Sequence, residues 1–327
     1  MVTAVADPDA SRRAEVGSAW GIARRHAATA ALAADPEVDL VAVCVPPDEH
    51  VAAALEVLDA GRHLFVEKPL APSLDELDRL VAHPALARVT AAVGFNLRHH
   101  RQVLAARRML RSGRLGRVGL LRTTLTSGIR LGETMPTWRR ERARGGGVLW
   151  ELGVHHADLW RALLDDEIVE VGAQVHGEPV EDDVATVTGR SARGTLVSAT
   201  FAQGTADANQ VELLGDRAAL RLDLLRGDGL RLVAVGRPGG GPGTRAREAA
   251  KAAIDLPRQL AVARRGGDFV ASYAAQWQDV VDAVRTGRPP AATLADGRRA
   301  TAIVAAAVCS ADERRAVALD ERDAVAP

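Results

Sequence analysis

The chain has 327 residues, of which 47% are hydrophobic and 26% charged, the balance of an ordinary globular protein with room for two domains. It carries 42 basic and 42 acidic residues, so no net charge would draw it to nucleic acid or to an anionic membrane surface. Neither a signal peptide nor an apolar run of about 18 residues is recognisable, and its two cysteines offer no disulfide framework, so we expect a cytoplasmic protein.

The first third of the chain alternates short apolar runs with helical segments. Strands are predicted at 2–6, 38–45, 63–66 and 89–95. Helical segments are predicted at 12–34, with a break near Gly17 and Gly21, and at 50–60. This alternation is typical of βαβ units with a parallel sheet. We therefore predict an α/β fold with a Rossmann-like NAD-binding domain over residues 1–97.

The pattern changes after residue 97. Helices are predicted at 100–112 and 148–164, and strands at 118–127, 168–175, 184–188, 195–201, 209–214 and 218–223. Consecutive strands with short turns favour a mostly antiparallel sheet. A helical insertion at 245–265 and helices at 269–285 and 294–310 follow. The second domain, residues 98–327, is thus predicted to be α+β.

Candidate cofactor residues follow the first two predicted strands. In open α/β sheets, ligands bind outside the carboxyl ends of the strands. Asp7 follows the first strand, where an acidic residue can bind ribose hydroxyls and repel a 2′-phosphate, which favours NAD over NADP. Val45 and Pro46 end the second strand, and His50 opens the next helix. An Asp-Pro turn and an ordinary N-terminal helix residue are the structural alternatives for Asp7 and His50.

Lys68, within Glu67-Lys68-Pro69, ends the third predicted strand. Its ammonium group there could hydrogen-bond a substrate hydroxyl and stabilise the alkoxide that develops as the proton leaves. The alternative is a surface lysine before a turn. Lys68 is, however, one of only two lysines in a chain that otherwise uses arginine, which favours a chemical role.

A glycine triplet at 145–147 precedes the third group of candidates, Glu151, His155 and Asp158. On an α-helix their spacing places all three side chains on one face. A histidine there can accept a hydroxyl proton, and a neighbouring carboxylate can orient its ring. A buried structural histidine and a metal site are the alternatives. The metal site is the weaker of the two, because no second ligand cluster is present.

These motifs together resemble the Gfo/Idh/MocA family, named for glucose–fructose oxidoreductase, inositol dehydrogenase and a rhizopine-catabolism protein. The resemblance extends over essentially the whole chain. It rests on Glu67-Lys68-Pro69, on Gly94-Phe95-Asn96-Leu97-Arg98, on the glycine run leading to Gly153-Val154-His155-His156-Ala157-Asp158, and on the closing segment that contains Gly287-Arg288-Pro289.

The resemblance implies a Rossmann domain joined to an open-faced sheet domain that binds substrate and forms a homodimer or homotetramer. It implies that Lys68 and His155 are catalytic, with Glu151 where the family commonly has aspartate. Asp7, Val45, Pro46, His50, Glu67, Lys68 and Asn96 would bind NAD. Arg98, Trp138, Arg139 and Asp158 would face the substrate, a sugar or polyol.

The chain departs from the resemblance at its beginning. The glycine-rich fingerprint should lie about 20 residues before the ribose-binding acid, and Asp7 leaves no room for it. The strand before that fingerprint is the centre of a 3-2-1-4-5-6 sheet. Without it, we expect its neighbours to be separated. We interpret this as a start codon placed too late or as a true truncation.

Three functional hypotheses follow. The first is an NAD-dependent oxidoreductase that moves a hydride between nicotinamide and a secondary alcohol of a sugar, sugar derivative or cyclitol. The second, motivated by the absent glycine loop, is a cofactor-free sugar-binding or regulatory subunit. The third is an NAD-assisted lyase or glycosidase in which the oxidation is transient.

Overall fold

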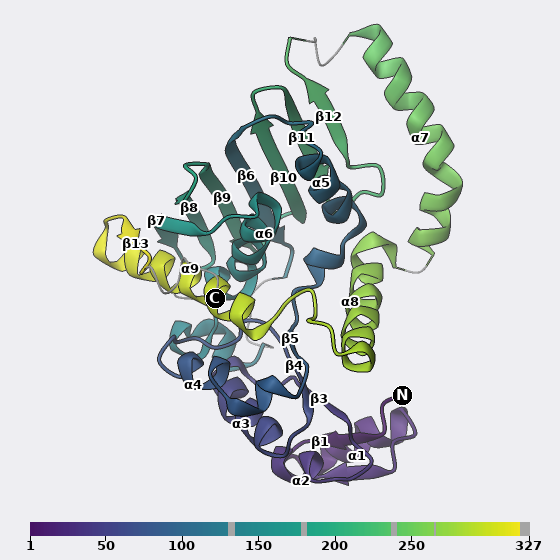
Figure 1. The fold of residues 1–327 in the computed structure, drawn as a ribbon, viewed down its shortest axis with the longest axis vertical. Coiled ribbons are helices and arrows are strands. Elements are labelled where there is room, and N and C mark those ends of the chain that lie inside the picture. The colour runs from purple at the N-terminus through teal and green to yellow at the C-terminus, as the bar shows by residue number, and fades with distance from the viewer. Residues whose placement is uncertain (130–134, 178–181, 237–240, 265, 321–327) are drawn as a thin grey trace. The chain divides into compact units, whose positions relative to one another are not determined.

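The computed structural model describes residues 1–129, 135–177, 182–236, 241–264 and 266–320 (Figure 1). The chain divides into two compact units. Unit 1 consists of Met1–Gly94 and Gln278–Arg298, and unit 2 of Phe95–Trp277 and Arg299–Pro327. The sequence analysis divided the chain between residues 97 and 98 and assigned 278–298 to the second domain. The structure instead places that segment with unit 1, where Thr293 forms a β-bridge with Ala92 and Val280 packs on Phe65.

The strands of unit 1 are short and parallel, as predicted, but they form two separate sheets. One sheet has two strands and the other has three, with β4 in its centre. The strands are β1 (Ala4–Ala6) and β2 (Arg24–His26), then β3 (Leu40–Val43), β4 (His63–Val66) and β5 (Ala91–Val93). Among the described residues, no strand joins β1 to β3, which is the separation that the sequence led us to expect.

The helices of unit 1 are α1 (Ala10–Ala19), α2 (Thr29–Ala33), α3 (His50–Asp59) and α4 (Leu77–Val81). The segment 12–34 was predicted to be helical with a break near Gly17 and Gly21; it contains α1 and α2, but β2 between them was missed. Gly21 ends the first of these helices with a positive φ of 65°, a conformation that favours glycine. Strand β2 consists of two arginines and a histidine, so it carries no apolar signal by which it could have been recognised.

Unit 2 is built on an eight-stranded sheet with the order β12-β11-β10-β6-β9-β8-β7-β13. Only β6 and β9 pair in parallel among these described strands, so the predicted mostly antiparallel sheet is confirmed. The strands are β6 (Val118–Ser127), β7 (Ile168–His176), β8 (Val184–Ser191), β9 (Leu196–Gln203), β10 (Ala208–Gly215), β11 (Ala218–Asp223), β12 (Arg231–Ala234) and β13 (Val317–Ala318).

Helix α6 (Val154–Leu164) packs on one face of this sheet. Trp160 and Phe201 are almost fully buried there, with ring centroids 6.4 Å apart, and the Trp160 indole donates a hydrogen bond of 3.1 Å to Thr123. Alternate residues of β8 and β9 are buried and exposed, so the other face is open. The core of unit 2 therefore lies between α6 and the sheet.

The remaining helices are α5 (Arg101–Arg111), α7 (Pro242–Ala263), α8 (Gly267–Thr286) and α9 (Leu294–Glu313). Short 3₁₀ turns lie at Pro47–Glu49, Pro84–Ala87, Asn96–His99, Thr137–Arg140 and Arg142–Arg144. A π-helical turn, Leu149–Gly153, leads directly into α6. The helices predicted at 245–265, 269–285 and 294–310 correspond to α7, α8 and α9.

Candidate active site

Lys68 follows the last residue of β4, the central strand of the three-stranded sheet. Phe65 and Val66 of that strand are fully buried, whereas the Lys68 side chain is half-buried. The Lys68–Pro69 peptide bond is cis. Gly94 lies close beside this turn, since a Cβ added to it would stand 2.9 Å from a Glu67 carboxylate oxygen. The turn that carries Lys68 therefore follows a buried strand and packs closely against Gly94.

Two titratable groups flank the turn. Burial raises the pKa of the Glu67 carboxyl, and the neighbouring Lys68 charge opposes this shift. Burial, followed by the negative charge of Glu67, raises the pKa of the Cys44 thiol to about 11. By its accessible surface, however, the Cys44 residue is exposed. Its position after β3 places it beside the same turn.

His50 connects the turns that follow β3 and β4. Its Nδ1 lies 2.8 Å from the Pro69 carbonyl oxygen and its Nε2 lies 2.9 Å from the Val45 carbonyl oxygen. The side chain is only 1% exposed, and burial lowers its pKa. The sequence analysis predicted that His50 contacts the cofactor. The structure places both ring nitrogens against backbone carbonyl oxygens, and the contact with the cofactor stays a prediction.

Asp7 follows β1, and its carboxylate is held in a turn. One of its oxygens accepts a hydrogen bond of 2.8 Å from the Asp9 backbone N–H, and the other lies 3.9 Å from Arg12. Asp9 in turn caps α1 by accepting from the N–H groups of Ser11 and Arg12. The side chain of Asp7 remains 24% exposed, so it can still accept a hydrogen bond from a ligand.

The residues of unit 1 suit part of a nicotinamide dinucleotide. Asp7, Pro46 and Lys68 each follow the carboxyl end of a parallel strand, where dinucleotides bind. In the described part of unit 1, however, no glycine-rich turn follows a strand and opens a helix. Asp7 and Lys68 thus lie where the sequence analysis predicted a ribose-binding carboxylate and a lysine near the reacting end, whereas the described residues of unit 1 form no backbone cradle for a pyrophosphate.

The glycine run of unit 2 packs against the 3₁₀ turn that carries Trp138 and Arg139. A Cβ on Gly146 would stand 2.4 Å from the Trp138 carbonyl oxygen, and the Gly147 N–H donates to the Arg139 carbonyl oxygen at 3.0 Å. The Arg139 guanidinium lies 5.2 Å from the centre of the Trp138 ring and 3.5 Å from Glu151. The structure thus brings two predicted substrate residues next to Glu151.

Glu151 and His155 are half-buried at the junction of the π-helical turn and α6. The prediction that Glu151, His155 and Asp158 share one helical face assumed regular α-helical spacing. A π-turn has more residues per turn, so this assumption is wrong between residues 149 and 153. Such turns frequently occur at functional sites, which is consistent with the predicted roles of both residues.

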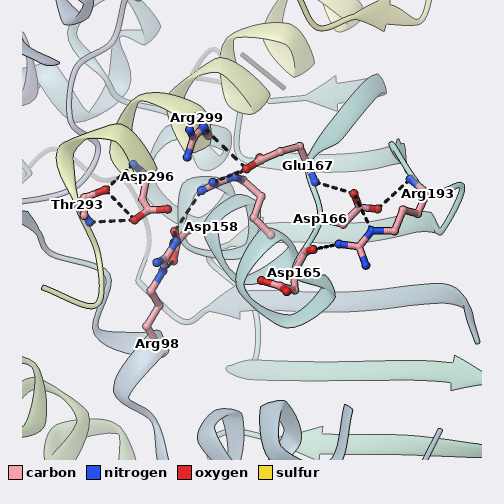
Figure 2. Close-up of polar contacts among 10 residues, drawn as sticks. Arg98, Asp158, Asp165, Asp166, Glu167, Arg193, Thr293, Asp296 and Arg299 are labelled. Carbon is pink, nitrogen blue, oxygen red and sulfur yellow. Dashed lines mark hydrogen bonds and ion pairs between the residues drawn. The ribbon is translucent and has the colours of Figure 1, made fainter. Parts of the chain in front are cut away.

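Arg98 and Asp158 form a buried ion pair, shown in Figure 2. The Arg98 Nε and Nη2 atoms lie 2.8 Å and 2.6 Å from the two Asp158 carboxylate oxygens. The side chains are 9% and 1% exposed. Both residues were predicted to face the substrate, and Asp158 was also expected near His155. The pairing gives each of them a structural partner, because a buried charge requires one, and the predicted contacts with substrate stay predictions.

Asn96, a predicted cofactor residue, is fully buried in unit 2. Its amide nitrogen donates a hydrogen bond of 2.9 Å to Ser272. Its amide oxygen has no hydrogen-bond partner among the residues that the structure describes. The predicted contact with NAD stays a prediction.

Asp182 is a site residue that the sequence analysis missed. Its buried carboxylate lies 3.2 Å from Arg142 Nε and accepts a hydrogen bond of 3.3 Å from the Leu149 N–H, and its backbone oxygen accepts from the Val148 N–H. Asp182 therefore anchors the start of the helix that carries Glu151. It belongs to no recognisable motif, so only the folded chain could reveal it.

Two family models match this chain. Residues 1–95 match the oxidoreductase family with an NAD-binding Rossmann fold, and residues 103–221 match the GFO/IDH/MocA C-terminal domain. The chain belongs to the Gfo/Idh/MocA oxidoreductase family. It is therefore an NAD-binding oxidoreductase by family, as the motifs indicated.

Related family members act on sugars and cyclitols. A 1,5-anhydro-D-fructose reductase of Ensifer adhaerens is 33% identical over 184 residues, 53% of this chain and 55% of that protein. A myo-inositol 2-dehydrogenase of Thermotoga maritima is 25% identical, with 98% and 92% of the two chains aligned. The chain thus spans about half the length of the first relative and nearly all of the second.

Solved structures show the same fold. A levoglucosan dehydrogenase in complex with NADH is 20% identical and superposes with a TM-score of 0.80, covering 97% of this chain and 90% of that one. Within its described residues, this family member has neither a membrane-spanning helix nor a group of three metal-ligating side chains.

Proposed function

We propose that this chain catalyses NAD-dependent oxidation of a secondary alcohol in a sugar, sugar derivative or cyclitol, or the reverse reduction. The observation that carries the proposal is the position of Lys68 two residues after the central strand of a parallel sheet, in a chain of an NAD-binding oxidoreductase family. A bound nicotinamide would supply the hydride acceptor for the oxidation, or the hydride donor for the reverse reduction.

In this proposal His155 acts as the base for the hydroxyl proton, and the Lys68 ammonium is a hydrogen-bond donor to a substrate oxygen. Glu151 orients the His155 ring, supported by its ion pair with Arg139 at 3.5 Å. Trp138 and Arg139 contact the substrate, since their half-buried turn lies against the glycine run before the catalytic helix. NAD is preferred to NADP because the Asp7 carboxylate repels a 2′-phosphate.

We also propose that the protein is a cytoplasmic homodimer or homotetramer. The open face of the unit 2 sheet supports this assembly. Leu196 and Leu232 are 53% and 40% exposed, and Glu212 pairs with Arg122 and Arg221 on the same sheet. An open sheet face of this kind can be covered by a second copy. Light scattering after size-exclusion chromatography would show a monomer if the proposal is wrong.

The catalytic roles are tested with His155→Ala and Lys68→Ala, with His176→Ala as a control at an exposed histidine of β7. NADH formation is followed with a panel of cyclitols and anhydro sugars. Loss of a general base or of an oxygen-stabilising donor should lower kcat about 100-fold or more. The control should turn over like the unmodified chain, and unchanged kcat in both test variants would contradict the mechanism.

A second candidate function is favoured by the separation of β1–β2 from β3–β4–β5. A chain without a pyrophosphate cradle could bind sugars without the cofactor and serve as a binding or regulatory subunit. The two functions differ in a calorimetric titration with NAD, which only the oxidoreductase should bind.

A further inference from the structure

We propose that His50 is a positioning residue for Lys68, and that the bond between its Nδ1–H and the Pro69 carbonyl oxygen performs this role. The proposal deepens the proposed function and rests on it, because Lys68 needs positioning only if it acts on substrate. Its geometrical part stands on unit 1 alone: one buried imidazole spans two backbone turns, at 2.8 Å and 2.9 Å.

The two turns need a connection because the strand ladder ends before them. Strands β3 and β4 pair in register up to Val43 and Val66, and the Glu67 N–H still donates to the Val43 carbonyl oxygen at 3.0 Å. Beyond that point the chains turn away into Val45-Pro46 and Lys68-Pro69. Prolines have no N–H, so neither turn can extend the ladder at these positions.

The ring of His50 makes this connection. His50 is the first residue of α3, in which Val51 and Ala54 are buried, so the backbone that carries the ring is held in place. Burial lowers the pKa of His50, and its backbone contacts with Pro69, Val45 and Leu70 oppose this shift. A neutral imidazole has one N–H to donate, so only one of the two carbonyl contacts is then a hydrogen bond, and the other is a close approach without a hydrogen. The shorter contact, Nδ1 to Pro69, receives that hydrogen in our assignment.

The Pro69 carbonyl belongs to the Pro69–Leu70 peptide group, and the proline ring restricts φ of Pro69, so holding this carbonyl also limits the movement of the preceding Lys68–Pro69 peptide group. The Lys68 side chain then leaves a backbone that is held on both sides of the residue, by the Glu67 N–H bond before it and the Pro69 carbonyl bond after it. A catalytic ammonium benefits from such preorganisation, because misplacement by about 1 Å can cost 100-fold in rate.

The two ring contacts can be separated by substitution. An asparagine amide nitrogen takes approximately the place of Nδ1, whereas a glutamine amide nitrogen takes that of Nε2. His50→Asn therefore keeps a donor to the Pro69 carbonyl oxygen. His50→Gln keeps the contact with the Val45 carbonyl oxygen and loses the hydrogen bond to the Pro69 carbonyl oxygen. His63→Gln is the matched control, since the half-buried His63 accepts from the Thr90 N–H at 2.9 Å and lies on β4 away from the turn.

The readout is amine labelling, which needs neither cofactor nor turnover. An acylating ester is added at fixed pH, and peptide mass spectrometry gives the ratio of labelling at Lys68 to that at Lys251, the other lysine of the chain. His50→Gln should change this ratio about threefold or more, the effect of losing one hydrogen bond. His50→Asn and His63→Gln should leave it nearly unchanged.

Any other pattern overturns the proposal. Equal changes in all three variants would mean general loosening of unit 1, and no change in any variant would mean that Lys68 is held without His50. A changed labelling ratio in His50→Asn alone would mean that the contact with Val45, and not the bond to Pro69, positions Lys68. If a variant fails to fold, ¹⁵N-histidine NMR of the unmodified chain decides instead, because a hydrogen on Nε2 rather than Nδ1 contradicts the assignment.

Turnover then separates this proposal from the proposed function. If Lys68 is catalytic, His50→Gln should lower kcat with little change in KM for the alcohol, and His50→Asn should restore most of kcat. A labelling change without any loss of kcat would support the positioning of Lys68 and contradict its catalytic role.

Discussion

At the scale of single residues, the Arg98–Asp158 pair shows how a motif residue can serve the fold. The two side chains meet through two short hydrogen bonds in an almost fully buried position. Nearby, Glu167 pairs with Arg161 at 2.5 Å and with Arg299 at 3.8 Å (Figure 2). These contacts join the start of unit 2, α6 and the beginning of the Arg299–Pro327 segment.

We predict that Asp158→Asn lowers the free energy of unfolding by about 3 kcal/mol or more, because it leaves the Arg98 charge buried without its partner. Urea denaturation measures this change. The control is Glu170→Gln, which breaks an exposed pair with Arg190 whose side chains are 43% and 49% exposed. That variant should lose less than about 1 kcal/mol. Similar small losses in both variants would contradict a structural role for Asp158.

His156 supplies a prediction about pH. It is fully buried, its Nε2 lies 3.1 Å from the Asn209 amide oxygen, and burial lowers its pKa to about 4. Its unfolded-state pKa is about 6.5. Between these two values the unfolded state binds a proton that the folded state does not. Stability is therefore fully present above about pH 6.5 and is lost as the pH falls toward 4.

The matched variant is His156→Gln, which keeps an amide near Asn209 and does not titrate. Between pH 7 and pH 5, the unmodified chain should lose about 2 kcal/mol more stability than this variant. Denaturation at the two pH values gives the difference. Burial also lowers the pKa values of His50 and His100. Both residues are present in the unmodified chain and in the variant, so their contributions to the pH dependence of stability cancel in the comparison. Equal losses would show that His156 is not kept neutral by the fold.

At the scale of elements, the glycine run is the segment whose conformation most depends on residue type. Gly147 has a φ of 85°, and a Cβ there would stand 2.0 Å from the Asp182 carboxylate. The same carboxylate accepts from the Leu149 N–H, so movement of Asp182 would disturb the start of the catalytic helix.

We predict that Gly147→Ala destabilises unit 2 by about 1–3 kcal/mol through backbone strain and lowers kcat by displacing Glu151. Gly119→Ala on β6 is the control, since its φ is not in the left-handed region and no atom lies within 4 Å of its added Cβ. Thermal unfolding and turnover are measured for both. If the two variants behave alike, the glycine run does not constrain the helix.

Element prediction succeeded where one physical signal dominated. The ranges of β6 and β11 were predicted to the residue, because polar turns border their apolar runs. It failed at β2, which has no apolar residue, and it missed β12 and β13, which have 4 and 2 residues. The π-turn before α6 was also missed, since helical spacing alone does not distinguish it from an α-helix.

The candidate site was only partly predictable for a similar reason. Motif order predicted Lys68 and His155 as catalytic, which stays a prediction. The structure shows that both side chains are half-buried and follow β4 and the π-turn. The roles of His50 and Asp182 depend on contacts with residues 19 and 33 positions away. Such contacts are set by tertiary packing, so no local pattern could reveal them.

At the scale of the whole molecule, the separation of the parallel strands is the feature with the largest consequence. Strands β2 and β1 form one sheet, and β3, β4 and β5 form the other. In a dinucleotide-binding sheet with the strand order 3-2-1-4-5-6, β2 and β1 would correspond to strands 3 and 2, and β3, β4 and β5 to strands 4, 5 and 6. Strand 1 of such a sheet leads into the phosphate-binding turn. The family fold and the residues at the strand ends point to NAD, while the described residues lack that turn.

The central claim is that the carboxyl ends of β1, β3 and β4 form the cofactor side of an NAD-dependent oxidoreductase. Calorimetric titration with NAD tests it on two proteins: the 327-residue chain, and the same chain with a strand, a Gly-x-Gly-x-x-Gly turn and a helix joined in front of Met1. We predict that the extended protein binds NAD at least about tenfold more tightly, since it gains the pyrophosphate contacts. Absence of NAD binding by both proteins would contradict the claim and favour a cofactor-free binding subunit.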